Sequence, residues 1–148
     1  MKKLLLSLFL IAGLNAQTEA QDKYTNVKVT SIKVNKVPLE RLNGTPFDAD
    51  GYPDLYATFS VHNESWYTTN YYDHCCMYPL TFDLVRPFKV ENLDIPYTLN
   101  IMDLDRYGDD EVVQIFKDIK FANYKDYPSE IVLKYQNRAE VVLSVKWY

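Results

Sequence analysis

Carboxylate side chains gather in two short segments of this chain, residues 48–54 and 103–111. These segments hold Asp48, Asp50, Asp54, Asp103, Asp105, Asp109, Asp110 and Glu111. Asp103 and Asp105 are two positions apart, so in an extended chain both side chains project from the same face. A hard cation such as calcium takes roughly six to eight oxygen ligands, and one loop rarely supplies them all. We therefore interpret the two segments as two halves of one metal site.

At these residues the sequence resembles the C2 domain, the calcium- and lipid-binding β-sandwich of protein kinase C and synaptotagmin. The first loop of that family has Asp, five residues, Asp, Pro and Tyr. In this chain Asp48 and Asp54 have that spacing and Tyr56 occupies the Tyr position, whereas Leu55 replaces the Pro.

The third loop of the family has Asp-x-Asp, five residues, Asp and then apolar residues. Asp103 and Asp105 match this pattern, Glu111 occupies the last acidic position, and Val112-Val113 follow. Gln114 stands where Gly is usual. The resemblance extends over residues 25–148, with Pro79-Leu80-Thr81-Phe82 inside the domain and a closing strand that ends at Tyr148.

The resemblance implies that calcium is the cofactor and that loop carbonyl groups complete its coordination. The implied ligands are Asp48, Asp54, Asp103, Asp105 and Glu111, with Asp50, Asp109 and Asp110 as rivals. It also implies that the loaded loops meet phospholipid head groups through Tyr52, Tyr107 and Arg106. The competing interpretation is that these Asp residues only form turns, because an Asp side chain bonds to its own backbone.

Short apolar alternations predict the strands that would position these loops. Such alternation recurs within residues 55–61, 80–84, 97–101, 131–135 and 141–147. A change of phase between Val29 and Ile32 predicts a bulge in the first strand. Residues 112–116 suit either a strand or a short helix. These features predict an antiparallel β-sandwich. Together with the resemblance they imply eight strands in a C2-like arrangement, with residues 45–54 and 103–111 at the same end.

The N-terminus has the pattern of a secretory signal peptide. Lys2 and Lys3 precede an apolar run at residues 4–14, and small residues follow at Ala16 and Ala20. An apolar run this short does not span a bilayer. We expect a signal peptide at 1–20, cleaved after Ala16 or Ala20, and one secreted or periplasmic domain over residues 21–148, in a protein of bacterial type.

The net charge argues against a nucleic-acid partner. The chain carries −4, and loss of the two lysines with the signal peptide would leave −6, or −5 if Glu19 is also removed. Binding to phosphate backbones needs a basic surface, which an acidic chain does not provide. The acidic charge also argues against simple adhesion to anionic lipid. The resemblance implies a phospholipid surface, met through the calcium-loaded loops, or another exported protein as the partner.

An aromatic segment supports an alternative function. Trp66, Tyr67, Tyr71 and Tyr72 lie close together in the sequence and could form a face that binds carbohydrate or protein, with a structural calcium or no metal. Cross-strand pairing of Tyr residues on a sheet is the simpler explanation. Aromatic residues at the loop tips would favour a membrane, whereas a flat sheet face would favour a glycan or a protein.

Cys75 and Cys76 are adjacent in the sequence. Three states are open for them: a strained vicinal disulfide, two buried thiols, or bonds to another chain. We expect them at a loop or strand edge, without a metal. His74 and Met77 add too few ligands for a soft-metal site. Since the sequence indicates no nucleophile–base pair, we expect that the protein is not an enzyme.

Overall fold

The computed structural model describes residues 24–48, 52–61, 64–72, 77–105 and 108–148. Its elements are β1 (Val27–Lys36), β2 (Leu55–Val61), β3 (Glu64–Thr68), β4 (Leu80–Val90), β5 (Tyr97–Asp103), β6 (Glu111–Ile119), the short 3₁₀ helix η1 (Phe121–Asn123), β7 (Glu130–Tyr135) and β8 (Ala139–Trp147). The eight strands confirm the predicted fold class. The segment 112–116, left open between strand and helix, belongs to β6.

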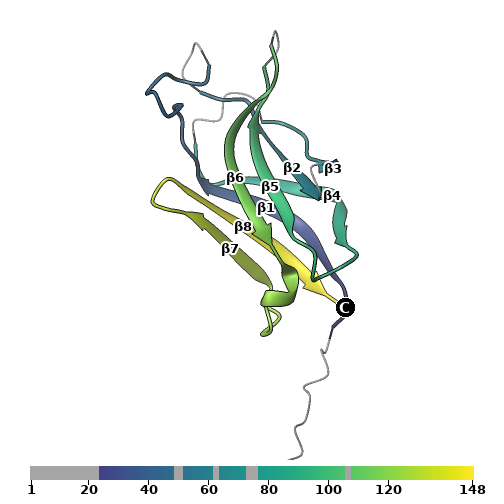
Figure 1. Cartoon of the computed structure of the whole chain (residues 1–148). Helices are drawn as coiled ribbons and strands as arrows, with labels where there is room; N and C mark the ends of the chain where they lie inside the picture. Colours follow the sequence, from purple (N-terminus) through teal and green to yellow (C-terminus); the bar gives the residue numbers. More distant parts are fainter. Residues whose placement is uncertain (1–23, 49–51, 62–63, 73–76, 106–107) are drawn as a thin grey trace, which may run out of the picture.

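The strands form two antiparallel sheets that face each other (Figure 1). One sheet has the order β4-β1-β8-β7 and the other β3-β2-β5-β6. The register of β1 shifts between Val29 and Ser31 in its pairing with both β4 and β8, which confirms the predicted bulge. The bulge lets Val29 and Ile32 both point into the core although they lie three positions apart.

Apolar side chains from both sheets fill the space between them. Phe59 of β2 and Phe88 of β4 belong to different sheets and stack with ring centroids 4.6 Å apart. Tyr97 of β5 packs edge-on against Phe88 at 5.8 Å. Because each large side chain moved out of water contributes about 1.5–3 kcal/mol, this aromatic group is a main connection between the sheets.

The two acidic segments lie in loops at one end of the sandwich, at the top of Figure 1. One loop connects β1 to β2 and the other connects β5 to β6. Strands β2 and β5 are neighbours, and Leu55 pairs with Asp103 at the edge of these loops. The loop between β4 and β5, η1 and the C-terminus lie at the opposite end.

The described residues contain no helix long and apolar enough to cross a membrane. The expected signal peptide, residues 1–20, lies outside the described residues.

Candidate metal site

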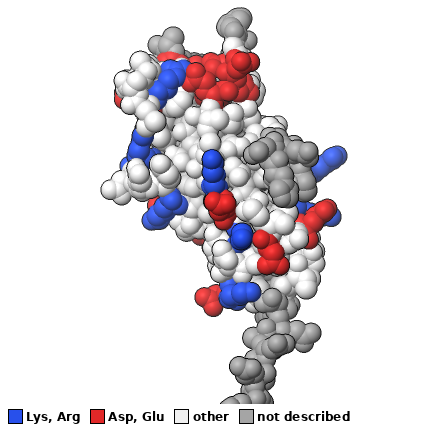
Figure 2. Space-filling view, in the orientation of Figure 1, with Lys and Arg blue, Asp and Glu red and all other residues white. Residues whose placement is uncertain are grey.

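Asp48, Asp103 and Asp105 bring a carboxylate oxygen each to within 4.8 Å of one another. Asp48 comes from the β1–β2 connection, whereas Asp103 ends β5 and Asp105 follows it. These residues were assigned to one site in the sequence, and the structure brings them together. Figure 2 shows the acidic side chains gathered over this end of the molecule.

Backbone hydrogen bonds hold the two loops against each other. The backbone N–H of Asp54 donates to Oδ1 of Asp103 at 2.8 Å. The backbone N–H of Leu104 donates in turn to the carbonyl oxygen of Asp54 at 2.9 Å. The buried Asp54 therefore joins the strand ends that carry the site. Its carboxylate lies outside the group formed by Asp48, Asp103 and Asp105 among the described residues.

Asp103 is fully buried, with 0% of its surface exposed, and one of its oxygens lacks a partner. Oδ1 accepts the hydrogen bond from Asp54, but Oδ2 accepts none from the part of the chain that the structure describes. A buried polar atom without a hydrogen bond is costly, and such atoms in native proteins call for an explanation. This carboxylate lies close to two others, an arrangement that is compatible with a cation site.

The electrostatics of Asp103 agree with this geometry. Burial, together with the negative charges of Asp48, Asp105 and Asp54, raises the pKa of Asp103 to about 6, against the opposing effect of the Asp54 hydrogen bond. Desolvation and like charges both disfavour the ionised form. A bound divalent ion would reverse both effects, since it replaces the lost hydration and neutralises the neighbours.

Asp110, a rival ligand in the sequence, organises the β5–β6 loop. Its Oδ1 accepts the backbone N–H of Asp105 at 3.2 Å, and its Oδ2 accepts the hydroxyl of Tyr56 at 2.6 Å. Burial, aided by this hydrogen bond to a carboxylate, raises the pKa of Tyr56 to about 12. Asp110 thus positions Asp105, while the other rival in this loop, Asp109, is exposed.

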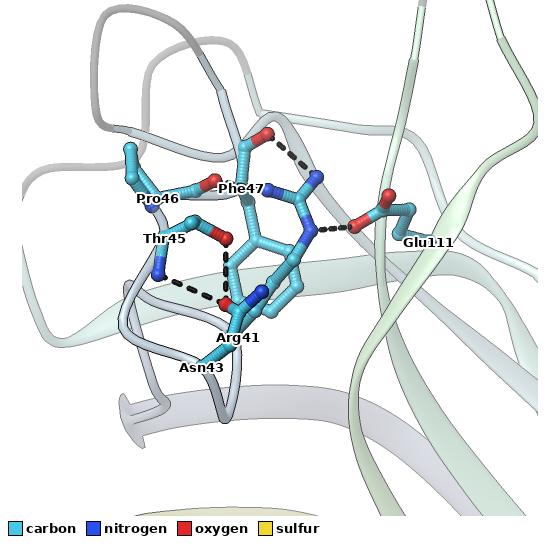
Figure 3. A network of polar contacts seen from close by, with 6 residues as sticks. All are labelled: Arg41, Asn43, Thr45, Pro46, Phe47 and Glu111. Atoms are coloured by element: carbon cyan, nitrogen blue, oxygen red, sulfur yellow. Dashed lines mark hydrogen bonds and ion pairs between the residues drawn. The ribbon is translucent and has the colours of Figure 1, made fainter.

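Glu111, predicted as the last ligand, is paired with Arg41 in this structure (Figure 3). Arg41 Nε lies 2.7 Å from Glu111 Oε2, and the guanidinium also donates to the carbonyl oxygens of Pro46 and of Phe47, the latter at 3.0 Å. The ring of Phe47 lies 5.2 Å from the guanidinium carbon. The hydrogen bond from Arg41 lowers the pKa of Glu111 and raises that of Arg41.

Arg41 therefore puts a positive charge beside the acidic cluster, where Asp105 and Asp103 also act on it electrostatically. The sequence analysis missed this residue. A single arginine in a loop belongs to no periodic pattern, so no local signal identifies its role. Gln114, which replaces the usual Gly of the family, is buried, and its Nε2 donates to the carbonyl oxygen of Ile115 at 2.8 Å.

Several residues of the sequence analysis lie outside the described residues. They are Asp50, Arg106, Tyr107, Cys75 and Cys76. The expectations for these residues remain predictions. Tyr52, which was expected at a loop tip, is described and is 42% exposed.

The described tyrosines of the aromatic segment do not form one exposed row. Tyr67 is partly buried and packs against Phe88 with ring centroids 6.0 Å apart. Tyr71 and Tyr72 are exposed, and the backbone N–H of Tyr72 donates to the carbonyl oxygen of Leu55 at 2.7 Å. Since Leu55 borders the acidic loops, Tyr71 and Tyr72 lie toward the acidic end of the sandwich rather than in the middle of a sheet face.

Comparison with known proteins identifies the fold from structure alone. No protein-family model matches the sequence, and no curated protein matches it. Among solved structures, BON1-C2B is similar with a TM-score of 0.56 and 10% identity, over 90% of this chain and 99% of the other. A single C2 domain of plant Extended Synaptotagmin 1 is similar with a TM-score of 0.51 and 12% identity, over 84% and 95% of the two chains.

A third similar structure contains two such domains. It is the calcium-bound pair of C2 domains of Extended-Synaptotagmin 2, with a TM-score of 0.53 and 10% identity, over 85% of this chain and 45% of the other. The strand order, the paired loops at one end and these matches agree. The chain therefore has the fold of a C2 domain.

Proposed function

We propose that this chain is an exported, non-catalytic module that binds calcium and, through the calcium-loaded loops, an anionic phospholipid surface. The single observation that carries the proposal is the buried carboxylate of Asp103. One of its oxygens has no hydrogen bond within the described residues, and it faces the carboxylates of Asp48 and Asp105.

The donor set suits calcium better than a softer metal. Asp48, Asp103 and Asp105 supply oxygen only, and the grouped ligands include no His or Cys. Hard cations prefer such oxygens, whereas zinc and copper favour nitrogen and sulfur. Asp54 and backbone carbonyl groups of the loops would complete the coordination. Outside a cell, an affinity of about 10⁻⁴–10⁻³ M is enough to keep such a site filled.

Exposed tyrosines at the same end support a membrane surface as the partner. Tyr52, Tyr71 and Tyr72 each expose between 42% and 50% of their surface beside the acidic loops. Tyr is suited to the polar–apolar boundary of a bilayer, because it combines an apolar ring with a polar tip. Without calcium, the acidic loops repel an anionic head group. With calcium bound, most of this negative charge is neutralised, and head-group phosphates can complete the metal coordination.

The test separates calcium binding from membrane binding. Isothermal titration with calcium should show saturable binding to the wild type and little binding to Asp103→Asn or Asp48→Asn. Asp94→Asn, in the exposed loop at the opposite end, is the matched control and should bind as the wild type does. Calcium that binds all four proteins equally would refute the assigned site.

The second measurement is co-sedimentation with vesicles of phosphatidylserine and phosphatidylcholine, in calcium and in chelator. The wild type should sediment with the anionic vesicles only when calcium is present. Tyr71→Ala should reduce that fraction while leaving the calcium titration unchanged. If the protein binds calcium but does not bind vesicles, the proposed calcium site stands and the proposed membrane partner is wrong.

A further inference from the structure

The edge strand β7 has a more regular backbone than the other three edge strands. β4 contains Pro87, β3 is only five residues long, and β6 has two register shifts and a positive φ of 59° at Asp118. β7 contains no proline and no residue of positive φ, and its protection consists of the exposed charges of Glu130 and Lys134. β7 pairs with β8 from Glu130 to Tyr135 without a shift. In Figure 1, no described segment runs along the outer side of β7. A regular, uncovered edge is a template for pairing.

The hydrogen-bond pattern shows which backbone groups of β7 face outward. The backbone N–H of Val145 donates to the carbonyl oxygen of Ser129 at 2.8 Å, and these two residues are directly opposite in the register. Hydrogen-bonded positions alternate along an antiparallel strand. Ile131 and Leu133 therefore bond toward β8, whereas the N–H and C=O groups of Glu130, Val132 and Lys134 point away from it.

The residues at these outward-bonding positions are self-complementary. If a second β7 strand lies antiparallel with Val132 opposite Val132, each Glu130 lies opposite a Lys134 of the other copy. Both Glu130 and Lys134 are exposed, and Val132 exposes 50% of its surface. The buried positions also match, since Ile131 then lies opposite Leu133. A slip by one residue would place core side chains opposite solvent-facing ones.

We propose that a second copy of this chain pairs with β7 in this register and forms a symmetric dimer. The three outward-bonding positions would supply about six backbone hydrogen bonds, two from each pair. The two four-stranded sheets β4-β1-β8-β7 then become one continuous sheet. The ammonium of Lys134 already bonds to Glu140 at 2.9 Å, and with 64% of its side chain exposed it has donors left for the Glu130 of the partner copy.

The symmetry determines where the metal ends lie. Matching the same face of both strands requires a two-fold axis perpendicular to the sheet. Such a rotation reverses the strand direction, so the two acidic ends point in opposite directions. The dimer contact uses β7, which contains none of Asp48, Asp103 and Asp105, so association should not depend on calcium.

The test is the mass of the chain by sedimentation equilibrium, from about 1 μM to about 1 mM, in chelator and in calcium. The wild type should change from monomer to dimer with rising concentration, equally in both buffers. Glu130→Lys or Lys134→Glu alone places like charges opposite each other at both symmetry-related positions. Either substitution should weaken association at least about tenfold.

The decisive sample is an equimolar mixture of the Glu130→Lys and Lys134→Glu chains. Each chain supplies the charge that the other lacks, so the mixture should form a mixed dimer at concentrations where each variant alone is still mostly monomeric. Glu130→Lys leaves the Lys134–Glu140 ion pair within the chain intact. A loss of association in this variant therefore cannot be attributed to a loss of that ion pair and of the stability it gives to the fold. Lys117→Glu, the same charge change on β6, is the control and should dimerise like the wild type.

Three results would overturn the proposal. The first is a wild type that stays monomeric over the whole concentration range. The second is a mixture of the two variants that remains monomeric while thermal melting shows both chains folded. The third is an association that Lys117→Glu abolishes and the β7 variants leave unchanged, because this would place the contact on β6 and not on the edge of β7.

Discussion

Replacement of Asp103 by Asn should stabilise the calcium-free protein at neutral pH. Burial, with help from neighbouring charges, raises the pKa of Asp103 from 3.8 to about 6 in the folded state. One pKa unit corresponds to about 1.4 kcal/mol, so the ionised carboxylate costs the folded calcium-free protein about 3 kcal/mol above pH 6. Asn retains the shape of the side chain and an oxygen that can accept the Asp54 N–H, but it carries no charge.

The sign of the pH dependence follows from the same pKa shift. Between about pH 4 and pH 6 the folded state holds a proton on Asp103 that the unfolded state has already lost. Unfolding therefore releases protons in this window, and the contribution of Asp103 to stability falls as the pH rises. Above pH 6 the full penalty is present. The Asn variant lacks this contribution, and its advantage over the wild type should grow from pH 4 to pH 6.

The assay is urea denaturation in chelator at pH 4, 5, 6 and 7. At pH 7 the variant should gain up to about 3 kcal/mol, or about 10 °C in melting temperature. In calcium at about 1,000 times the dissociation constant the order should reverse, because only the wild type gains about 4.1 kcal/mol. Asp94→Asn is the control. If the free energy of unfolding of Asp103→Asn changes with pH in parallel with that of the wild type, the reasoning is refuted.

Three further predictions concern the surroundings of the site and the core. Arg41→Gln should raise calcium affinity about three- to tenfold, measured by titration, because it removes a competing positive charge and releases Glu111. Tyr56→Phe should cost about 0.5–1.5 kcal/mol in urea denaturation, since it removes the hydrogen bond to Asp110. Phe59→Ala should cost about 3–5 kcal/mol by the same assay, with calcium affinity unchanged in the protein that remains folded.

The strands and their class could be predicted from the sequence, because side-chain alternation is a local property. A half-buried strand must place apolar residues at every second position, so the pattern of residues 55–61 or 97–101 identifies a strand without knowledge of its partners. The bulge of β1 is also visible in the sequence, since one extra residue changes the phase of that pattern. Val112–Phe116 was undecided, because the bulges of β6 interrupt its alternation.

The proximity of the three clustered carboxylates could be predicted for a related reason. Asp103 and Asp105 lie at the end of a recognisable strand, so their proximity follows from short-range geometry. Asp48 joins them in the structure through the pairing of β2 with β5, which the family resemblance implied and the alternation pattern alone did not.

Only the tertiary structure decided which acidic side chains lie in the cluster and which make contacts that hold the loops in place. Glu111 pairs with Arg41, which lies 70 positions away in the sequence. Asp110 binds Tyr56 of a neighbouring strand, and Asp54 uses its backbone to hold Asp103. At a given spacing all acidic residues look alike in a sequence. Their roles differ because the burial of each carboxylate and its distance to the nearest opposite charge depend on how the loops pack. Neither quantity can be read from the neighbouring residues in the sequence.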